Sequence, residues 1–142
     1  MILSWSYQSS ALGDLESHLL DIVRVADRRN QSLNVSGVLA YDASGYYQLL
    51  EGPLDGIAEL RWSILRDRRH KVHTQKLEPR RHRSTPVCLP MAFIQTSIPH
   101  CALLRPGGAH AMAAFECHLL DRAEEQYPIS YGQRKHTATP CN

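Results

Sequence analysis

The feature that most constrains the fold is a pair of strand-like segments that lies between two helix-like segments. Residues 35–41 and 46–51 are rich in Val, Leu and Tyr, and Asp-Ala-Ser-Gly separates them at 42–45. A compact turn of this kind joins neighbouring antiparallel strands, so we expect the two segments to pair as a hairpin.

The segments before this hairpin predict a strand and then a helix. Residues 2–7 alternate between two faces, which predicts a strand whose apolar face carries Leu3, Trp5 and Tyr7. Gly13 and Asp14 favour a helix start, and the helix is expected to end around Asn30. Its apolar residues recur at steps of three and four, with one adjacent pair: Leu15, Leu19, Ile22, Val23 and Ala26.

A second helix is expected after Gly52-Pro53, ending at 67–70, and two further strands near 72–77 and 88–94. The helix has the expected buried stripe Leu54, Ile57, Leu60, Ile64 and Leu65. The order βαββαβ plus one strand predicts a ferredoxin-like α+β sandwich with both helices on one sheet face. A last amphipathic helix from about Ala109 is expected to cover the other face with Met112, Phe115, Leu119, Leu120 and Ala123.

Composition excludes several function classes. Sixteen Lys and Arg against fourteen Asp and Glu give a formal charge of +2, too close to neutral for a dedicated nucleic-acid binder. The sequence has no apolar run long enough for a membrane helix, and its start lacks a basic signal-peptide region. We therefore expect a cytoplasmic protein. The basic segment Arg80–Arg83 is expected to be solvated, with contact to an acidic partner as the alternative.

Metal and dithiol chemistry are not indicated. The four cysteines are far apart, and no C-x-x-C pair occurs among Cys88, Cys101, Cys117 and Cys141. Reduced thiols are the expectation and disulfides the alternative. His70 and His73 have ligand-like spacing, but no cluster of carboxylates or cysteines completes a metal site, so a surface pair is the preferred interpretation.

Three polar residues occupy positions that the pattern assigns to the core. Asn30 continues the apolar stripe of the first helix, while Tyr7 and Gln48 lie on apolar faces of different strands. An unpaired buried amide costs about 1–3 kcal/mol, so these groups need partners. Two interpretations stay open: satisfied core groups, or an apolar slot that holds a planar ligand with polar edges.

Four segments in the same order and spacing make the chain resemble the BLUF domain, a blue-light sensor that uses flavin. They are Tyr7–Ala11, Asn30–Leu39, Tyr46–Pro53 and Asp67–His70, and the resemblance runs from about residue 1 to about residue 93. It implies a BLUF domain at 1–97, a C-terminal helical cap at 98–128 and a polar tail at 129–142.

The resemblance also implies a non-covalently bound flavin between the two helices: FAD, with FMN or riboflavin also accepted. Tyr7 would be the photo-oxidised tyrosine, and Gln48 the amide that bridges it to the flavin. Asn30 would bind the pyrimidine edge of the ring. Four further residues would line the ligand, with solvated helix ends as their alternative role: Arg29, Asp67, Arg69 and His70.

The sequence departs from the family pattern on the last strand, where Met91 and Leu89 occupy the positions of the signal relay. Met91 fits the pattern, whereas Leu89 replaces the family's tryptophan, Pro86 its phenylalanine and Ser84 its arginine. Leu89 has no indole N–H, so a switch based on that tryptophan is excluded. Met91, or a shift of the strand, would have to carry the signal.

The resemblance to the short form of the family predicts a sensor without a fused catalytic domain. Its members act through protein partners and often self-associate, so we expect a downstream signalling protein and a homo-oligomer. Two alternatives are a flavin-free adaptor with the same fold and a small acyl-phosphate hydrolase. The hydrolase would need an anion-binding loop, and no Gly-rich phosphate loop of recognised spacing leads into a helix.

Overall fold

Strands and helices follow one another in the predicted order. The computed structural model describes residues 1–13, 15–41, 45–85, 91–95 and 108–126. The elements are β1 (Ile2–Ala11), α1 (Leu15–Ser32), β2 (Ser36–Tyr41), β3 (Gly45–Gly52), α2 (Leu54–Leu65), β4 (His70–Arg80), β5 (Ala92–Gln95) and α3 (Gly108–Gln126).

The strands form a five-stranded sheet in the order β4-β1-β3-β2-β5. The predicted hairpin is confirmed, since β2 and β3 pair antiparallel with Val38 opposite Leu49. β1 pairs antiparallel with both β3 and β4, and β5 adds to β2 in parallel. Because β3 lies between β1 and β2, the chain has the split βαβ arrangement of the ferredoxin-like fold.

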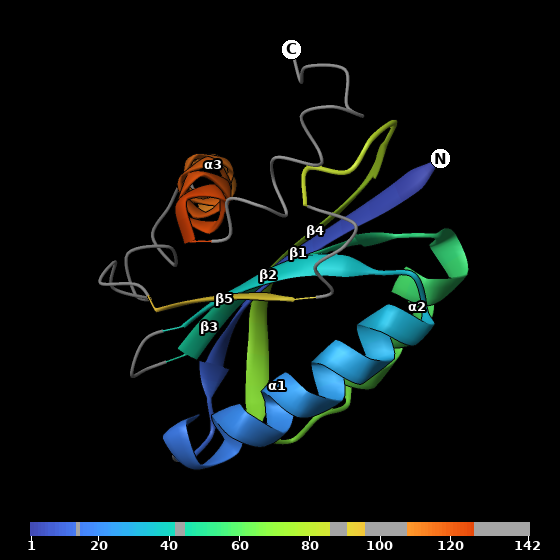
Figure 1. Ribbon diagram of the computed structural model, residues 1–142. Coiled ribbons are helices and arrows are strands. Elements are labelled where there is room, and N and C mark those ends of the chain that lie inside the picture. Colours follow the sequence, from blue (N-terminus) through green and yellow to red (C-terminus); the bar gives the residue numbers. More distant parts are fainter. Residues whose placement is uncertain (14, 42–44, 86–90, 96–107, 127–142) are drawn as a thin grey trace.

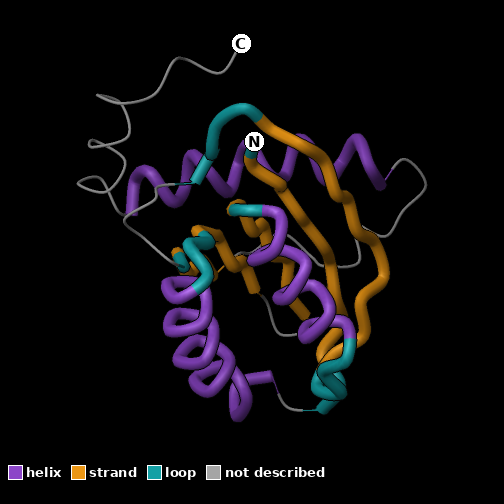
Figure 2. Tube along the Cα trace, turned by 90° about the vertical axis from the view of Figure 1, so that its right-hand side faces the viewer, coloured by secondary structure: helices purple, strands orange, loops and turns teal. Residues whose placement is uncertain are grey.

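The sheet has helices on both faces, as predicted. Helices α1 and α2 lie together on one face, and α3 crosses the other, where it contacts β2 and β5 (Figure 1, Figure 2). Side chains alternate along β3, so Tyr46, Gln48 and Leu50 face α1 and α2, while Tyr47, Leu49 and Glu51 face α3. Among the described residues, no helix combines the length and apolarity that a membrane span requires.

The core on the α1 and α2 side corrects part of the predicted α2 stripe. Ile57 and Leu60 are buried and Ile64 packs against them, but Leu54 is 68% exposed and Leu65 is 41% exposed. At 3.6 residues per turn, both lie roughly a quarter turn or more from the buried row, which explains the error.

The other two predicted helical stripes are partly visible. Ile22 and Ala26 of α1 pack against the core, and Leu119 and Ala123 of α3 are buried. Five other predicted stripe residues have side chains outside the described part of the structure: Leu15, Leu19, Val23, Met112 and Phe115.

Two strands are longer than predicted. β1 continues past Tyr7 to Ala11, and β4 starts at His70 and continues to Arg80. β4 contains Pro79, which is tolerated because β4 is an edge strand of the described sheet, and an edge residue needs no second hydrogen-bonded neighbour.

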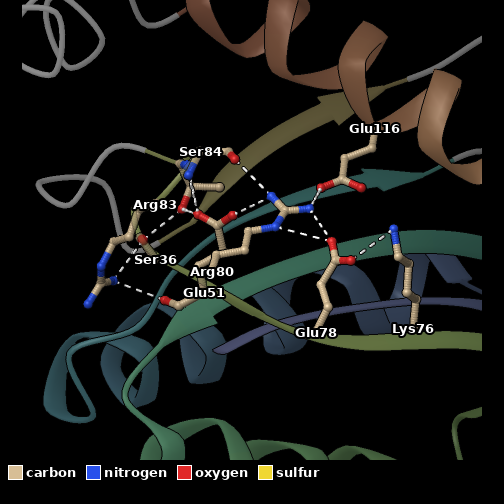
Figure 3. Close-up of polar contacts among 9 residues, drawn as sticks. Ser36, Glu51, Lys76, Glu78, Arg80, Arg83, Ser84 and Glu116 are labelled. Carbon is tan, nitrogen blue, oxygen red and sulfur yellow. Dashed lines mark hydrogen bonds and ion pairs between the residues drawn. The ribbon is translucent and has the colours of Figure 1, made fainter. Parts of the chain in front are cut away.

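The basic segment Arg80–Arg83, which begins at the last residue of β4, is not simply solvated, and the expectation was wrong for Arg80 and Arg83. The Arg80 guanidinium lies between three carboxylates, at 2.9 Å from Glu51, 2.8 Å from Glu78 and 2.8 Å from Glu116 of α3 (Figure 3). Arg83 donates to the Ser36 hydroxyl and to backbone carbonyls. We call Arg80, Glu51, Glu78 and Glu116 the Arg80 cluster; it connects α3 to the sheet.

Candidate functional site

A pocket opens between α1, α2 and the sheet face that they cover. Its walls include Ile22, Ala26, Leu60 and Ile64, which make it apolar between the helices. All seven residues that the resemblance assigned to photochemistry or flavin binding line it: Tyr7, Arg29, Asn30, Gln48, Asp67, Arg69 and His70. The structure thus brings together segments from four distant parts of the chain.

The polar centre of this pocket is a tyrosine–glutamine pair. Tyr7 on β1 is directly opposite Gln48 on β3, and both side chains are almost fully buried. The Tyr7 hydroxyl donates a hydrogen bond to Gln48 Oε1. The Gln48 amide nitrogen lies 3.8 Å from the Met91 sulfur, where it can donate a weak hydrogen bond.

The surroundings of Tyr7 keep its phenol protonated. Its ring stacks on Trp5 with the centroids 4.6 Å apart, and it also contacts Tyr46 and His70 edge-on or tilted. Burial raises the pKa of Tyr7 well above its usual value, and Tyr46 and Asp67 raise it further. Tyr7 is therefore a neutral hydrogen-bond donor at physiological pH.

Asn30 reaches the pocket because α1 ends next to it. Its side chain is 2% exposed, and its backbone carbonyl accepts a 2.8 Å hydrogen bond from Val35 N–H. The chain leaves the helix through Asn34, whose φ of 56° is left-handed, a conformation that asparagine tolerates after a helix. This ending directs the chain straight into β2 and keeps the Asn30 amide at the pocket.

Arg29 connects the two helices beside the pocket. It donates to the Ser63 hydroxyl at 2.6 Å and pairs with Glu59 at 3.2 Å. In the loop after α2, Arg69 pairs with Asp67 at 2.5 Å. Its guanidinium holds the pKa of the Asp67 carboxyl below the usual value, so both groups are charged at neutral pH.

His70 supplies a buried polar atom that has no partner within the described structure. Its Nε2 lies 3.0 Å from the Ile64 carbonyl oxygen, which can only accept, so Nε2 carries the proton. Nδ1 is buried and has no hydrogen-bond partner. Burial lowers the pKa of His70, which keeps the ring neutral and leaves a lone pair on Nδ1.

Some residues at the pocket were not predicted as site residues. Tyr46 lies two residues before Gln48 on the same sheet face, and its ring stacks on His70 with centroids 5.1 Å apart. The strand alternation that placed Gln48 was the signal for it. No sequence pattern marked Ser63 as a site residue, because its role depends on the hydrogen bond that it accepts from Arg29 of α1.

Of the two predicted relay residues, Met91 lies within the described residues and Leu89 does not. Met91 is 3% exposed and contacts Gln48 directly before β5 begins. Leu89 and Pro86 lie outside the described residues. Ser84, at the family's arginine position, donates its backbone N–H to Glu51 at 2.6 Å and accepts a hydrogen bond from Arg80.

Among the described residues, no group of three or more His, Cys, Asp or Glu side chains could hold a metal ion. His73 contacts the Ser10 hydroxyl at 2.6 Å. Cys117 is an exposed free thiol, and the other three cysteines lie outside the described residues.

A pocket with aliphatic walls and a polar centre, set between the helices of a ferredoxin-like sandwich, suits the binding of a small flat molecule. The chain matches the family model described as "Sensors of blue-light using FAD" over residues 2–85. The chain belongs to this BLUF family of flavin-based blue-light photoreceptors.

Individual relatives agree with this assignment. The chain is 38% identical over 50 residues to the blue light- and temperature-regulated antirepressor BluF of Escherichia coli; the match covers 35% of this chain and 12% of that protein. It is similar to the dark-state structure of the BLUF protein BlrB, with a TM-score of 0.70 and 26% identity over 92% of this chain and 96% of that one. It also shares the fold of BlsA in its ground state, with a TM-score of 0.71 and 23% identity over 84% and 88% of the two chains.

Proposed function

We propose that this chain senses blue light through a flavin held in the pocket between α1 and α2, without catalysing a turnover reaction. The observation that carries the proposal is the buried Tyr7–Gln48 hydrogen bond at the polar centre of that pocket. The residues also fit the ligand: aliphatic walls suit a flat ring system, while the Gln48 amide and the partnerless His70 Nδ1 suit its polar edge.

The bound flavin supplies the light absorption and the redox chemistry. Tyr7 would give up an electron and a proton, with the excited flavin as the acceptor of both, and would recover both afterwards, so that the chain returns to its original covalent state. During this exchange the Gln48 amide loses its hydrogen-bond donor. Because its two ends have nearly the same shape, it can reverse or tautomerise within the same space. In a buried site the changed hydrogen bonds are strengthened by the low dielectric.

Asn30 is proposed to hold the pyrimidine edge of the ring, while Arg29, Asp67, Arg69 and His70 hold the rest of the ligand. Replacing Asn30 by alanine is expected to weaken flavin binding about tenfold, the effect of losing one buried hydrogen bond of about 1–1.5 kcal/mol. Flavin retained after dialysis measures this. Asn34 is not a suitable control position, because its backbone is left-handed and alanine would be strained there. The control is Gln31→Ala, since Gln31 is an exposed neighbour of Asn30. Equal retention by Asn30→Ala and Gln31→Ala would contradict the assignment.

Met91 is proposed to carry the change from Gln48 to α3, which contacts β5 on the far face of the sheet. The output is proposed to be altered association, either with a second copy of this chain or with a downstream protein. A light-driven change of about 1–3 kcal/mol in the free-energy difference between two surface conformations suffices to alter association.

Light scattering in darkness and under blue light tests this output. We expect the molar mass of the wild-type protein to change on illumination. Met91→Leu keeps the volume but removes the sulfur acceptor, so its spectral response should remain while the change in mass is reduced. A constant mass of the wild-type protein would refute self-association as the output. A full change in the Met91→Leu variant would refute the relay.

A further inference from the structure

The solvent side of α2 carries a large aromatic residue that the core does not explain. Trp62 is 65% exposed and lies on the side of the helix opposite the buried residues Ile57 and Leu60. The Arg66 guanidinium lies over its ring, 3.9 Å from the ring centroid. The pair is spaced i, i+4 and therefore forms one exposed platform, which we call the Trp62–Arg66 platform.

This platform borders the flavin pocket. A shallow cavity at this end of α2 is lined by Trp62, Ser63, Arg66, Asp67 and Arg69. Three of these five residues, Ser63, Asp67 and Arg69, also line the pocket between the helices. A ligand that fills the pocket and carries an extended tail can therefore reach Trp62 without leaving the protein surface.

The charge along this path is positive. Arg69 is neutralised by its ion pair with Asp67. Within the part of the chain that the structure describes, Arg66 forms no ion pair, and its guanidinium lies over the indole of Trp62. A cation without an ion-pair partner therefore lies beside the exposed aromatic ring, in a shallow cavity that is mostly polar and adjoins the pocket. This combination suits an anionic linker followed by an aromatic base better than it suits an apolar protein surface.

We propose that the Trp62–Arg66 platform binds the adenosine diphosphate tail of FAD, with Arg66 facing the phosphates and the adenine stacking on Trp62. The inference rests on the proposed function and specifies which flavin the site prefers. FMN has a phosphate but no adenine, and riboflavin has neither. The platform therefore predicts the affinity order FAD, FMN, riboflavin.

The test is titration of the flavin-free wild-type protein and its variants with FAD, FMN and riboflavin, followed by flavin fluorescence. Trp62→Ala should weaken FAD binding about tenfold, the value of one base–aromatic stack, and leave FMN and riboflavin within twofold. Trp62→Phe should retain most of the FAD preference. Arg66→Gln should weaken FAD and FMN about threefold and leave riboflavin unchanged. Leu54→Ala, an exposed apolar residue near the start of α2, is the matched control and should change none of the three.

Added salt provides a second readout, since FAD and FMN affinities should fall with ionic strength while riboflavin affinity should not. Equal affinities of the wild-type protein for the three flavins, or an equal loss for all three in Trp62→Ala, would overturn the platform while leaving the blue-light proposal intact. If none of the three flavins binds, the proposed function itself fails, and the platform with it.

Discussion

Replacing Arg80 by methionine is expected to lower the free energy of unfolding by about 3 kcal/mol, because it leaves buried carboxylates without their shared cation. Glu51 is fully buried, Glu116 is 7% exposed, and the three carboxylates of the Arg80 cluster surround one guanidinium. Burial opposes the charge of Arg80, but the carboxylates outweigh it and raise the Arg80 pKa above its usual value.

The size of this effect follows from what remains after the substitution. Removing one partner of a buried ion pair typically costs about 3–5 kcal/mol. We expect the lower end because Glu51 keeps three donors, the backbone N–H groups of Ser84 and Thr85 and the Thr85 hydroxyl, at 2.6–2.9 Å. Arg80 is also 22% exposed, so water reaches part of the cluster.

Urea unfolding followed by circular dichroism measures the loss. Arg81→Met is the matched control: Arg81 is the next residue, it is exposed, and it should change the unfolding free energy by less than about 0.5 kcal/mol. If Arg80→Met and Arg81→Met have the same stability, the Arg80 cluster contributes nothing to holding α3 on the sheet.

The second large effect is the complete loss of the light response in Tyr7→Phe and in Gln48→Leu. Phenylalanine keeps the ring packed on Trp5 but cannot donate the phenolic proton. Leucine nearly keeps the volume of Gln48 but has no amide to rearrange. Both variants should still bind flavin and remain yellow, because neither removes the pocket walls. The blue-light shift of the flavin absorption bands should disappear in both.

Tyr47→Phe is the control for this pair. Tyr47 is as buried as Tyr7 and is the neighbour of Gln48 on β3, but its side chain is on the α3 face of the sheet. The Tyr47→Phe variant therefore loses a hydroxyl that is about as deeply buried as that of Tyr7, and it should keep a normal light response. A normal spectral shift in Tyr7→Phe, or a lost shift in Tyr47→Phe, would show that Tyr7 is not the photoactive residue.

The sequence predicted those parts of the fold that depend on local patterns. Two-residue alternation predicted β2 and β3, and helical spacing predicted α1 and α2. These patterns could be recognised because each lies within one hairpin or a few helical turns. The role of Gln48 came from the resemblance, since spacing alone did not decide between a satisfied core amide and a ligand-binding one. The structure adds that Tyr7 and Gln48 are direct partners across two strands.

The parts that the sequence did not predict depend on contacts between distant residues. Arg80 lies in a basic run that looked solvated, and its partners Glu51 and Glu116 come from β3 and α3. Similarly, the exposure of Leu54 and Trp62 depends on which side of α2 meets the sheet, a choice that apolar spacing near the helix ends does not fix. Long-range packing decides both.

The light-minus-dark absorption spectrum of the purified, flavin-loaded protein tests the central claim most directly. The Tyr7–Gln48 pair predicts that blue light moves the flavin bands slightly to longer wavelength and that they return in darkness, with no bleaching that would indicate a covalent adduct. A protein that remains colourless in excess FAD, FMN and riboflavin, or a yellow protein whose spectrum does not change on illumination, would contradict the account.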